Sequence, residues 1–231
     1  TVMSTSEETL TLSRAPAEAA APAAAEVAPA GDASGTGEAE LAAHRLTPAA
    51  LLERRRGAEA AYVFDLRDQE AFDAGHLPGA YSLPFEHLEP NLHRLPFSGD
   101  LMLYDGGEGL VQQAARLLLD NGFGEFFFVE EGLAGLEAAL RASPDEVHFE
   151  ALNDAERVAK VEEILDQRVR EFLARDGGGM EVKAIEKDRI LVAYQGACGG
   201  CGSSTAGTLR FIQNTLTIAL NHEMEVVPVE E

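Results

Sequence analysis

Apolar and polar positions follow two alternating patterns between residues 44 and about 143. Three short apolar runs have the length of buried strands, and each stops at an acidic residue: 61–64, 101–104 and 126–129. Helical spacing of apolar residues occurs over 48–56, where Thr47 is the expected N-cap, and from Leu110 to about Asn121. Strands that alternate with helices indicate βα units, so we expect an α/β domain whose parallel sheet has helices on both faces.

The pattern changes after about residue 153. The segments that we expect there, in chain order, are a helix over 158–172, strands over 180–185 and 190–194, a helix over 203–221 and a strand over 224–229. The Gly-rich run Asp176–Gly179 ends the first helix, and the four polar residues between the first two strands predict a hairpin. The order α-β-β-α-β is typical of a small α+β domain.

The segment from Ala15 to Gly37 is interrupted by proline and lacks large apolar side chains. Between Ala15 and Ala30, 10 residues are alanine and 3 are proline, and such a segment cannot bury enough surface to offset its ordering entropy. We therefore expect a disordered Ala/Pro-rich arm over 1–43. The two patterns above then define a middle domain over 44–148 and a C-terminal domain over 149–231.

Charge excludes several classes of partner. The chain of 231 residues has 18 Lys and Arg against 40 Asp and Glu, a formal net charge of −22. So acidic a chain is a poor match for nucleic acid or for an anionic membrane surface. No apolar run approaches the ~20 residues of a membrane helix, and the N-terminus lacks the pattern of a signal peptide. We expect a cytoplasmic protein.

The two cysteines of the chain, Cys198 and Cys201, form a CxxC pair within the Gly-rich run Gly196–Gly202. Such a pair can be a redox dithiol, half of a tetrahedral zinc site, or half the ligand set of an iron–sulfur cluster. A thioredoxin-like redox pair is expected early in a domain, within a βαβ pattern, whereas this pair follows a hairpin. The spacing alone leaves the three alternatives open.

The number of ligands restricts the metal alternatives. A zinc site or a cluster of this kind takes four ligands, and the C-terminal domain offers only these two thiols and His222. A homodimer supplies four thiolates across a two-fold axis. Glycines around the pair let backbone N–H groups approach the sulfurs, and Ser203–Thr205 would cap a helix whose positive end points at the site.

Two motifs of the C-terminal domain resemble the NifU C-terminal domain. They are the segment 174–178, with the sequence ARDGG, and the segment 192–204, with the sequence VAYQGACGGCGSS. The resemblance covers about residues 155–230 and implies a protein that assembles or carries iron–sulfur clusters. It also implies a 4Fe–4S cluster bridged between two subunits by Cys198 and Cys201 of each, and handed on to apo-proteins. Gly202 stands where the family commonly has proline, a difference that removes no ligand.

Residues 65–80, with the sequence DLRDQEAFDAGHLPGA, resemble the signature of rhodanese-like domains, although the glutamate is one place early. The segment 131–136 resembles the Gly-rich turn that precedes the last helix of such domains. The resemblance covers about residues 44–142 and agrees with the βα pattern. It implies a sulfurtransferase fold in which a cysteine follows the central strand. Within the signature, we interpret His76 as a residue that locks a turn rather than as a metal ligand.

The catalytic position of this resemblance is altered. Asp105 occupies the place of the nucleophilic cysteine, and Leu110 that of the usual arginine. A carboxylate cannot carry a transferable sulfur, because that chemistry requires a polarizable thiolate. We therefore expect no catalytic residue in this loop. Asp105 either caps the helix that starts at Leu110 or fills an anion-binding nest of Gly-rich backbone amides.

The leading hypothesis is an iron–sulfur scaffold or carrier without enzymatic turnover. Its cofactor would be a cluster, bound by Cys198 and Cys201 of two chains. The expected partners are a second copy of the chain, apo iron–sulfur proteins, and a cysteine desulfurase or other assembly factor docked by the middle domain. The alternatives are a sulfurtransferase, a thiol–disulfide oxidoreductase and a purely structural zinc dimer.

Overall fold

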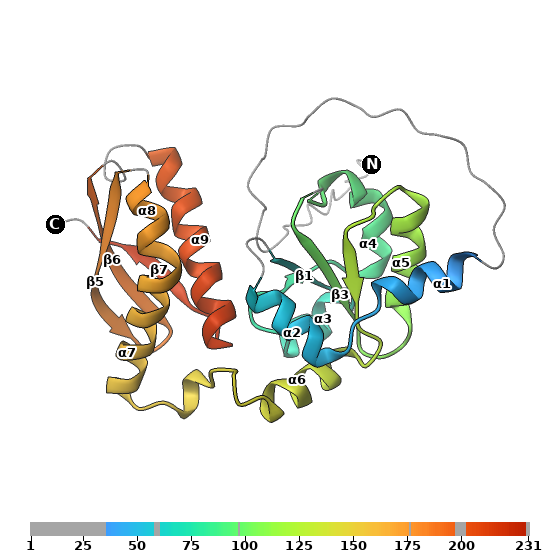
Figure 1. The fold of residues 1–231 in the computed structure, drawn as a ribbon, viewed down its shortest axis with the longest axis horizontal. Helices are drawn as coiled ribbons and strands as arrows, with labels where there is room; N and C mark the ends of the chain where they lie inside the picture. Colours follow the sequence, from blue (N-terminus) through green and yellow to red (C-terminus); the bar gives the residue numbers. More distant parts are fainter. Residues whose placement is uncertain (1–35, 58–60, 97, 176, 197–201, 230–231) are drawn as a thin grey trace, which may run out of the picture.

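The computed structural model describes residues 36–57, 61–96, 98–175, 177–196 and 202–229. They form two sheets, each with its own helices (Figure 1). The middle domain has a four-stranded sheet in the order β2-β1-β3-β4. Its strands are β1 Ala61–Asp65, β2 Tyr81–Ser82, β3 Asp100–Tyr104 and β4 Phe126–Phe128. All three strand pairs are parallel, which confirms the predicted sheet.

Helices cover both faces of this sheet, as expected. One face carries α1 Thr36–His44, α4 Phe85–Leu88 and α5 Leu110–Asp120, and the other carries α2 Pro48–Gly57, α3 Gln69–Ala74 and α6 Gly132–Ala142. A 3-10 helix, Glu89–Arg94, follows α4. Alternate residues of β3 separate the two cores: Leu101 and Leu103 pack into the first, Met102 and Tyr104 into the second. The apolar runs of the sequence are therefore strands buried on both sides.

Regular structure begins within the range expected to be a disordered arm. Residues 1–35 lie outside the described part of the chain, but 36–43 belong to helix α1, so the expectation of disorder over these residues is wrong. Leu41 is 7% exposed and lies in the core beside α5. The His44 ring stacks on Phe126, with 4.1 Å between ring centroids. Leu41, the His44 ring and the hydrogen bond between His44 Nδ1 and the Phe126 carbonyl connect this otherwise polar and alanine-rich helix to the domain.

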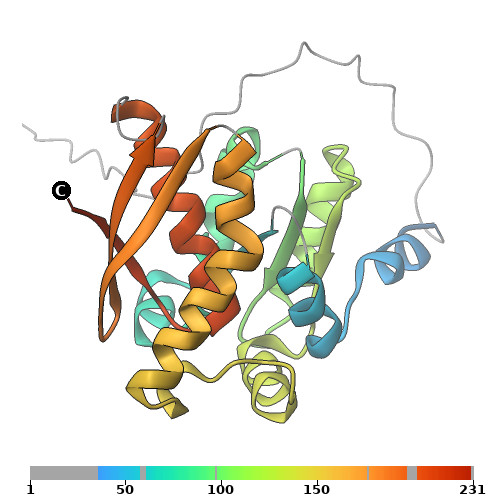
Figure 2. The same ribbon diagram turned by 60° about the vertical axis from the view of Figure 1, so that its left-hand side comes forward.

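The C-terminal domain has the predicted order α-β-β-α-β. A helical segment comprises α7 Asp154–Leu165, a π-helical turn Asp166–Arg170 and α8 Glu171–Arg175. The remaining elements are β5 Gly178–Glu186, β6 Arg189–Gly196, α9 Gly202–Leu220 and β7 Glu225–Pro228. The hairpin β5–β6 is antiparallel, and β7 pairs parallel with β6. Figure 2 shows α7, α8 and α9 against one face of this sheet.

A short segment joins the two domains between α6 and α7. It contains a 3-10 turn, Phe149–Ala151, and ends at Asn153, whose side chain accepts from the N–H of Glu156 while the Glu156 carboxylate accepts from the N–H of Asn153. This capping box sets the start of α7. Across the described ranges, we find no helix with the length and apolar character that crossing a membrane requires.

A buried polar network holds the carboxyl ends of β1 and β3 together. Asp65 has no exposed surface, and its carboxylate accepts from the Arg67 guanidinium at 2.6–3.1 Å. The Tyr104 hydroxyl accepts from the N–H of Leu77 at 3.1 Å. Burial, and then the charge of Asp65, raises the pKa of Tyr104. The phenol therefore stays neutral and ties the turn after α3 to the central strand.

Tyr104→Phe is expected to lower the free energy of unfolding by about 1–3 kcal/mol, because the buried N–H of Leu77 loses its acceptor while the ring packing is kept. Urea unfolding followed by circular dichroism measures this change. Tyr62→Phe, at a half-buried position of β1, is the control and should change the free energy of unfolding by under about 0.5 kcal/mol. Equal stability of the two variants would contradict a structural role for the Tyr104 hydroxyl.

Candidate functional site

The cysteine pair lies between two described elements. Cys198 and Cys201 themselves are outside the described residues, so the structure does not place their side chains. The described chain reaches Gly196, the last residue of β6, and resumes at Gly202, the first residue of α9. The described part of the candidate site therefore consists of the end of β6, the start of α9 and the start of β5, which pairs with the end of β6.

The hairpin brings the two NifU-like motifs together. Gly178 pairs with Gly196 and Gly179 pairs with Gln195, so the end of the ARDGG segment lies across from the strand that leads to the cysteines. Gly177 has a φ of +70°, a conformation that glycine adopts readily, and makes the turn from α8 into β5. Two motifs separated along the chain are thus joined at one end of the domain.

Helix α9 begins directly after the second cysteine. Because its first residue is Gly202, Ser203–Thr205 stand in its first turn and not before it, which corrects the expectation that they cap this helix from outside. The first turn of a helix presents unpaired N–H groups and the positive end of the helix dipole. An anionic group bound by the preceding thiolates would be stabilised there.

His222 is not available as a further ligand at this end of the domain. The 19 residues of α9 separate it from Gly202, which corresponds to about 27 Å of helix. Its Nε2 lies 2.8 Å from the Asp188 carboxylate, and its ring packs against Phe149. This hydrogen bond from His222 holds the pKa of Asp188 below its usual value. The nitrogen considered from sequence as a third ligand thus has a structural role.

A search for other metal sites finds none in the described part of the chain. No group of three or more His, Cys, Asp or Glu side chains is arranged there to hold a metal ion.

In the middle domain, Asp105 fills the cradle of its own loop. The residue is fully buried; Oδ1 accepts from the N–H of Gly107 at 2.7 Å, and Oδ2 accepts from the N–H of Val111 at 3.2 Å. Val111 is the second residue of α5, so one oxygen caps the helix while the other occupies the glycine loop. Asp105 therefore both caps α5 and fills the nest of backbone amides, the two interpretations that the sequence left open.

The turn before α6 covers this loop. The N–H of Leu133 donates to the Asp105 carbonyl at 2.9 Å. A Cβ atom on Gly132 would lie 2.7 Å from the Gly107 nitrogen, and the φ of Gly132 is +62°. Only glycine fits so close a backbone approach. The closing Gly-rich turn recognised in the sequence therefore packs on the altered catalytic loop.

The loop also carries a second carboxylate. Glu108 accepts from the N–H of Gly106 at 2.9 Å, on the exposed side. The N–H groups of Gly106, Gly107 and Val111 thus donate to carboxylates of the loop itself. A loop that binds its own anions offers these donors to no external one.

His76 locks a turn, as interpreted from the signature, and has a further contact that the sequence did not indicate. Its Nδ1 is hydrogen-bonded to the Phe72 carbonyl at 3.0 Å, and its ring stacks on Phe72 with 3.8 Å between centroids. Its Nε2 lies 3.6 Å from Glu223 of the C-terminal domain. Hydrogen bonding to Glu223 is the main cause that raises the pKa of His76. The contact joins residues far apart in the chain, so no local pattern could reveal it.

Comparison with known proteins agrees with both resemblances. The family model of the NifU-like domain matches residues 161–227, and that of the Rhodanese-like domain matches residues 47–139. The nitrogen fixation protein NifU of Anabaena sp. (strain L31) is 37% identical over 79 residues, which cover 34% of this chain and 70% of that protein. The nitrogen fixation protein NifU of Nostoc sp. is 36% identical over 78 residues, but this chain spans only 26% of its length.

Among solved structures, the solution structure of a rhodanese-like domain from Anabaena sp. is 30% identical. The match covers 41% of this chain and 74% of that one, with a TM-score of 0.38. The two family models, together with the sheet topology, show that the chain has an α/β rhodanese-like domain followed by a small α+β NifU-like domain.

Asp105→Ala is expected to destabilise the middle domain by about 1–3 kcal/mol, because the N–H groups of Gly107 and Val111 lose their acceptor and α5 loses its cap. Urea unfolding measures the effect. Glu108→Gln is the matched control in the same loop, and its exposed side chain predicts a change within about 0.5 kcal/mol. If Asp105→Ala were as stable as Glu108→Gln, Asp105 would not be the internal ligand of this loop.

Proposed function

Because this chain belongs to the NifU family, we propose that it binds an iron–sulfur cluster through Cys198 and Cys201 and passes that cluster to other proteins. Family membership supports a role in iron–sulfur cluster assembly. One observation carries the finer proposal: the β5–β6 register sets Gly178 against Gly196, at the strand end that leads into the cysteines. The glycine motif and the cysteine motif then act as one site.

Ligand number supports a cluster shared between two chains. Each chain contains two thiols, and His222 lies beyond the far end of α9, so one chain has half of a four-thiolate set. Two copies meeting at this end complete the ligands of one 4Fe–4S cluster. The cluster is the cargo of this protein, and its exchange with apo iron–sulfur proteins is the proposed activity. A cysteine desulfurase or other assembly factor is the proposed source of sulfur.

The surroundings described next to the pair favour an anionic group. A helix of 19 residues starts at Gly202, so its positive end comes directly after the cysteine segment in the chain. Peptide N–H groups near thiolates and sulfides are a common means of stabilising the negative charge of a cluster. The acidic balance of the chain argues separately against nucleic acid as a partner.

Anaerobic reconstitution with iron and sulfide is expected to give a brown dimer with about two irons per chain, since four irons are shared by two chains. Cys198→Ser and Cys201→Ser should each abolish stable cluster binding. Iron and sulfide analysis, native mass and Mössbauer spectra measure the outcome. His222→Gln is the matched control and should keep the full iron content, because His222 lies beyond the other end of α9.

Two results would overturn this proposal. A cysteine variant that still holds a complete cluster would show that the ligands lie elsewhere. Zinc in place of iron, in protein isolated without air and unable to take up a cluster, would indicate a structural zinc dimer, since thiolates accept both metals.

The proposal also assigns no sulfurtransferase activity to the middle domain. Asp105 stands in the place of the nucleophile, and a carboxylate cannot form the persulfide that the reaction needs. Thiocyanate formation from thiosulfate and cyanide should remain at the background rate, both in the wild type and in the Cys198→Ser/Cys201→Ser double variant. Thiocyanate formed by the double variant above the rate without protein would contradict this assignment.

A further inference from the structure

The middle domain contacts the C-terminal domain at the end of α9 that is remote from the cysteines. The contacts involve α2 and the turn 76–79 on one side, and the end of α9 with residues 221–223 on the other. Figure 1 shows α2 lying next to the lower end of α9. Three sets of polar contacts cross between the domains there.

The first set is centred on Asn221. Its side-chain oxygen accepts from the Arg55 guanidinium, and its side-chain nitrogen donates to Glu146 at 2.7 Å and to the Val147 carbonyl at 3.2 Å. Arg55 also donates to the Pro78 carbonyl at 3.0 Å. The side-chain amide of Asn221, directly after α9, is therefore hydrogen-bonded both to α2 and to the connecting segment.

The charged groups of this first set of contacts are buried. Arg55 is 2% exposed and Glu146 is 8% exposed. Burial lowers the pKa of Arg55 to about 10, against the opposing effect of the Glu146 charge. The Glu146 carboxylate accepts in addition from Arg56 at 3.1 Å. A buried cation is stable only while its hydrogen-bond partners remain in place, so this set favours the docked arrangement of the two domains.

The second set is centred on Glu223. Its carboxylate accepts from the N–H of Gly79 at 2.6 Å and lies near His76. Gly79 has a φ of +81°, and a Cβ there would come within 3.3 Å of Ile218 and 3.4 Å of Thr217. The turn that contains Gly79 therefore fits closely against the last turn of α9. The N–H of Gly79 donates to Glu223, which lies just after that helix.

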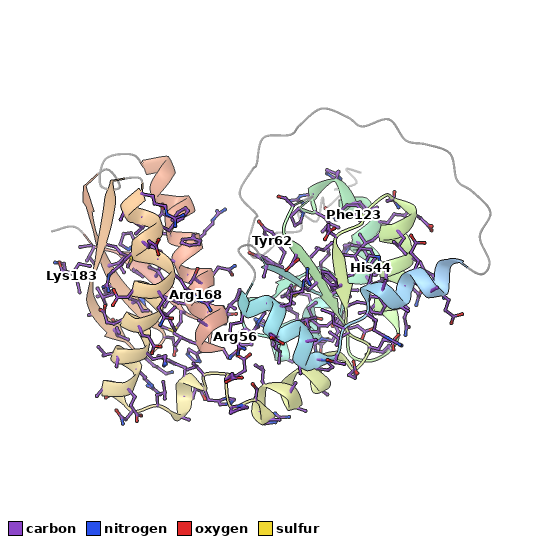
Figure 3. All side chains as sticks on the ribbon, in the orientation of Figure 1. His44, Arg56, Tyr62, Phe123, Arg168 and Lys183 are labelled. Carbon is purple, nitrogen blue, oxygen red and sulfur yellow. The ribbon has the colours of Figure 1, made fainter. Side chains whose placement is uncertain are left out.

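The third set involves the π-helical turn. Arg168 donates to the Arg56 carbonyl at 3.0 Å, and Figure 3 shows the two side chains lying near each other at the boundary between the domains. The last carbonyls of a helix lack partners within the helix, so an arginine of one domain caps α2 of the other. Arg168 lies in the π-helical turn Asp166–Arg170, and such a turn changes the direction in which the side chains of a helix point.

We infer that the middle domain is a docking surface for the C-terminal end of α9, with Arg55 and the N–H of Gly79 as receptors for Asn221 and Glu223. The occupant is the C-terminal domain of the same chain, which the segment 143–153 holds at high effective concentration. The docked end of α9 lies about 27 Å along the helix from its first residue, Gly202. The inference goes beyond the cluster proposal and can be tested on metal-free protein.

Hydrogen–deuterium exchange of the full metal-free chain tests the docking. Asn221→Gly is the sharpest variant, because Asn221 has a φ of +48° and glycine keeps that backbone while removing the amide. Exchange should rise about tenfold in peptides covering 76–80 and 217–224, which is the effect of losing a hydrogen bond to a charged group. Exchange in β1 and β3 should stay unchanged, which shows that the domain is still folded.

Glu223→Ala is the second variant, and Glu225→Gln is the matched control. Glu225 lies two residues further on, and its carboxylate pairs with Arg189 of its own domain at 2.7 Å. Glu223→Ala should raise exchange at 76–80, and Glu225→Gln should not. Both docking variants should also increase the radius of gyration measured by X-ray scattering.

His76 reports the same contact by NMR. Since Glu223 is the main cause of its raised pKa, Glu223→Ala should bring the pKa of His76 down toward the ordinary histidine value. Unchanged exchange at 76–80 in both Asn221→Gly and Glu223→Ala would overturn the inference. Protection at 76–80 that grows with protein concentration would also overturn it, since the occupant would then be a second copy.

Discussion

Two carboxylates without exposed surface, Asp65 and Asp105, close the carboxyl ends of the neighbouring strands β1 and β3. Buried charge is tolerated only where donors surround it. Asp65 obtains its donors from Arg67, and Asp105 obtains them from the backbone of its own loop. The turn before α3, the start of α5 and the turn before α6 all take their positions from this requirement. These two carboxylates therefore fix the loops at the carboxyl edge of the sheet.

This requirement also explains how a rhodanese-like fold persists without its cysteine. A loop of inward-pointing N–H groups needs an anion, and the Asp105 carboxylate supplies one covalently attached to the chain. The loop is then complete before any external anion arrives. The middle domain contacts the C-terminal domain through other residues, among them Arg55 and Gly79. An aspartate in this loop and contact of the same domain with the C-terminal domain are therefore compatible within one fold.

Local patterns in the sequence predict the regular elements well and their contacts poorly. The strands β1, β3 and β4 are readable because each is a compact apolar run, whereas β2 has two residues and leaves no period. Helix α1 is missed because one leucine, Leu41, anchors it in an otherwise polar and alanine-rich segment. Asn221 is readable as a helix end, but its partners are 75 and 166 positions away. Such pairings arise only once both domains have folded.

At the cysteine site, too, the local features can be predicted from the sequence and the long-range contacts cannot. The proposed ligands, Cys198 and Cys201, and their glycine-rich surroundings are predicted from the motifs, but the joining of the two motifs depends on the β5–β6 register. Helix α9 then connects this site to the docking surface, with the cysteine segment before its first residue and Asn221 after its last. Two chains that share a cluster through these cysteines would meet near the first residues of their α9 helices. In such a dimer, each middle domain would contact the end of α9 that is remote from the shared cluster.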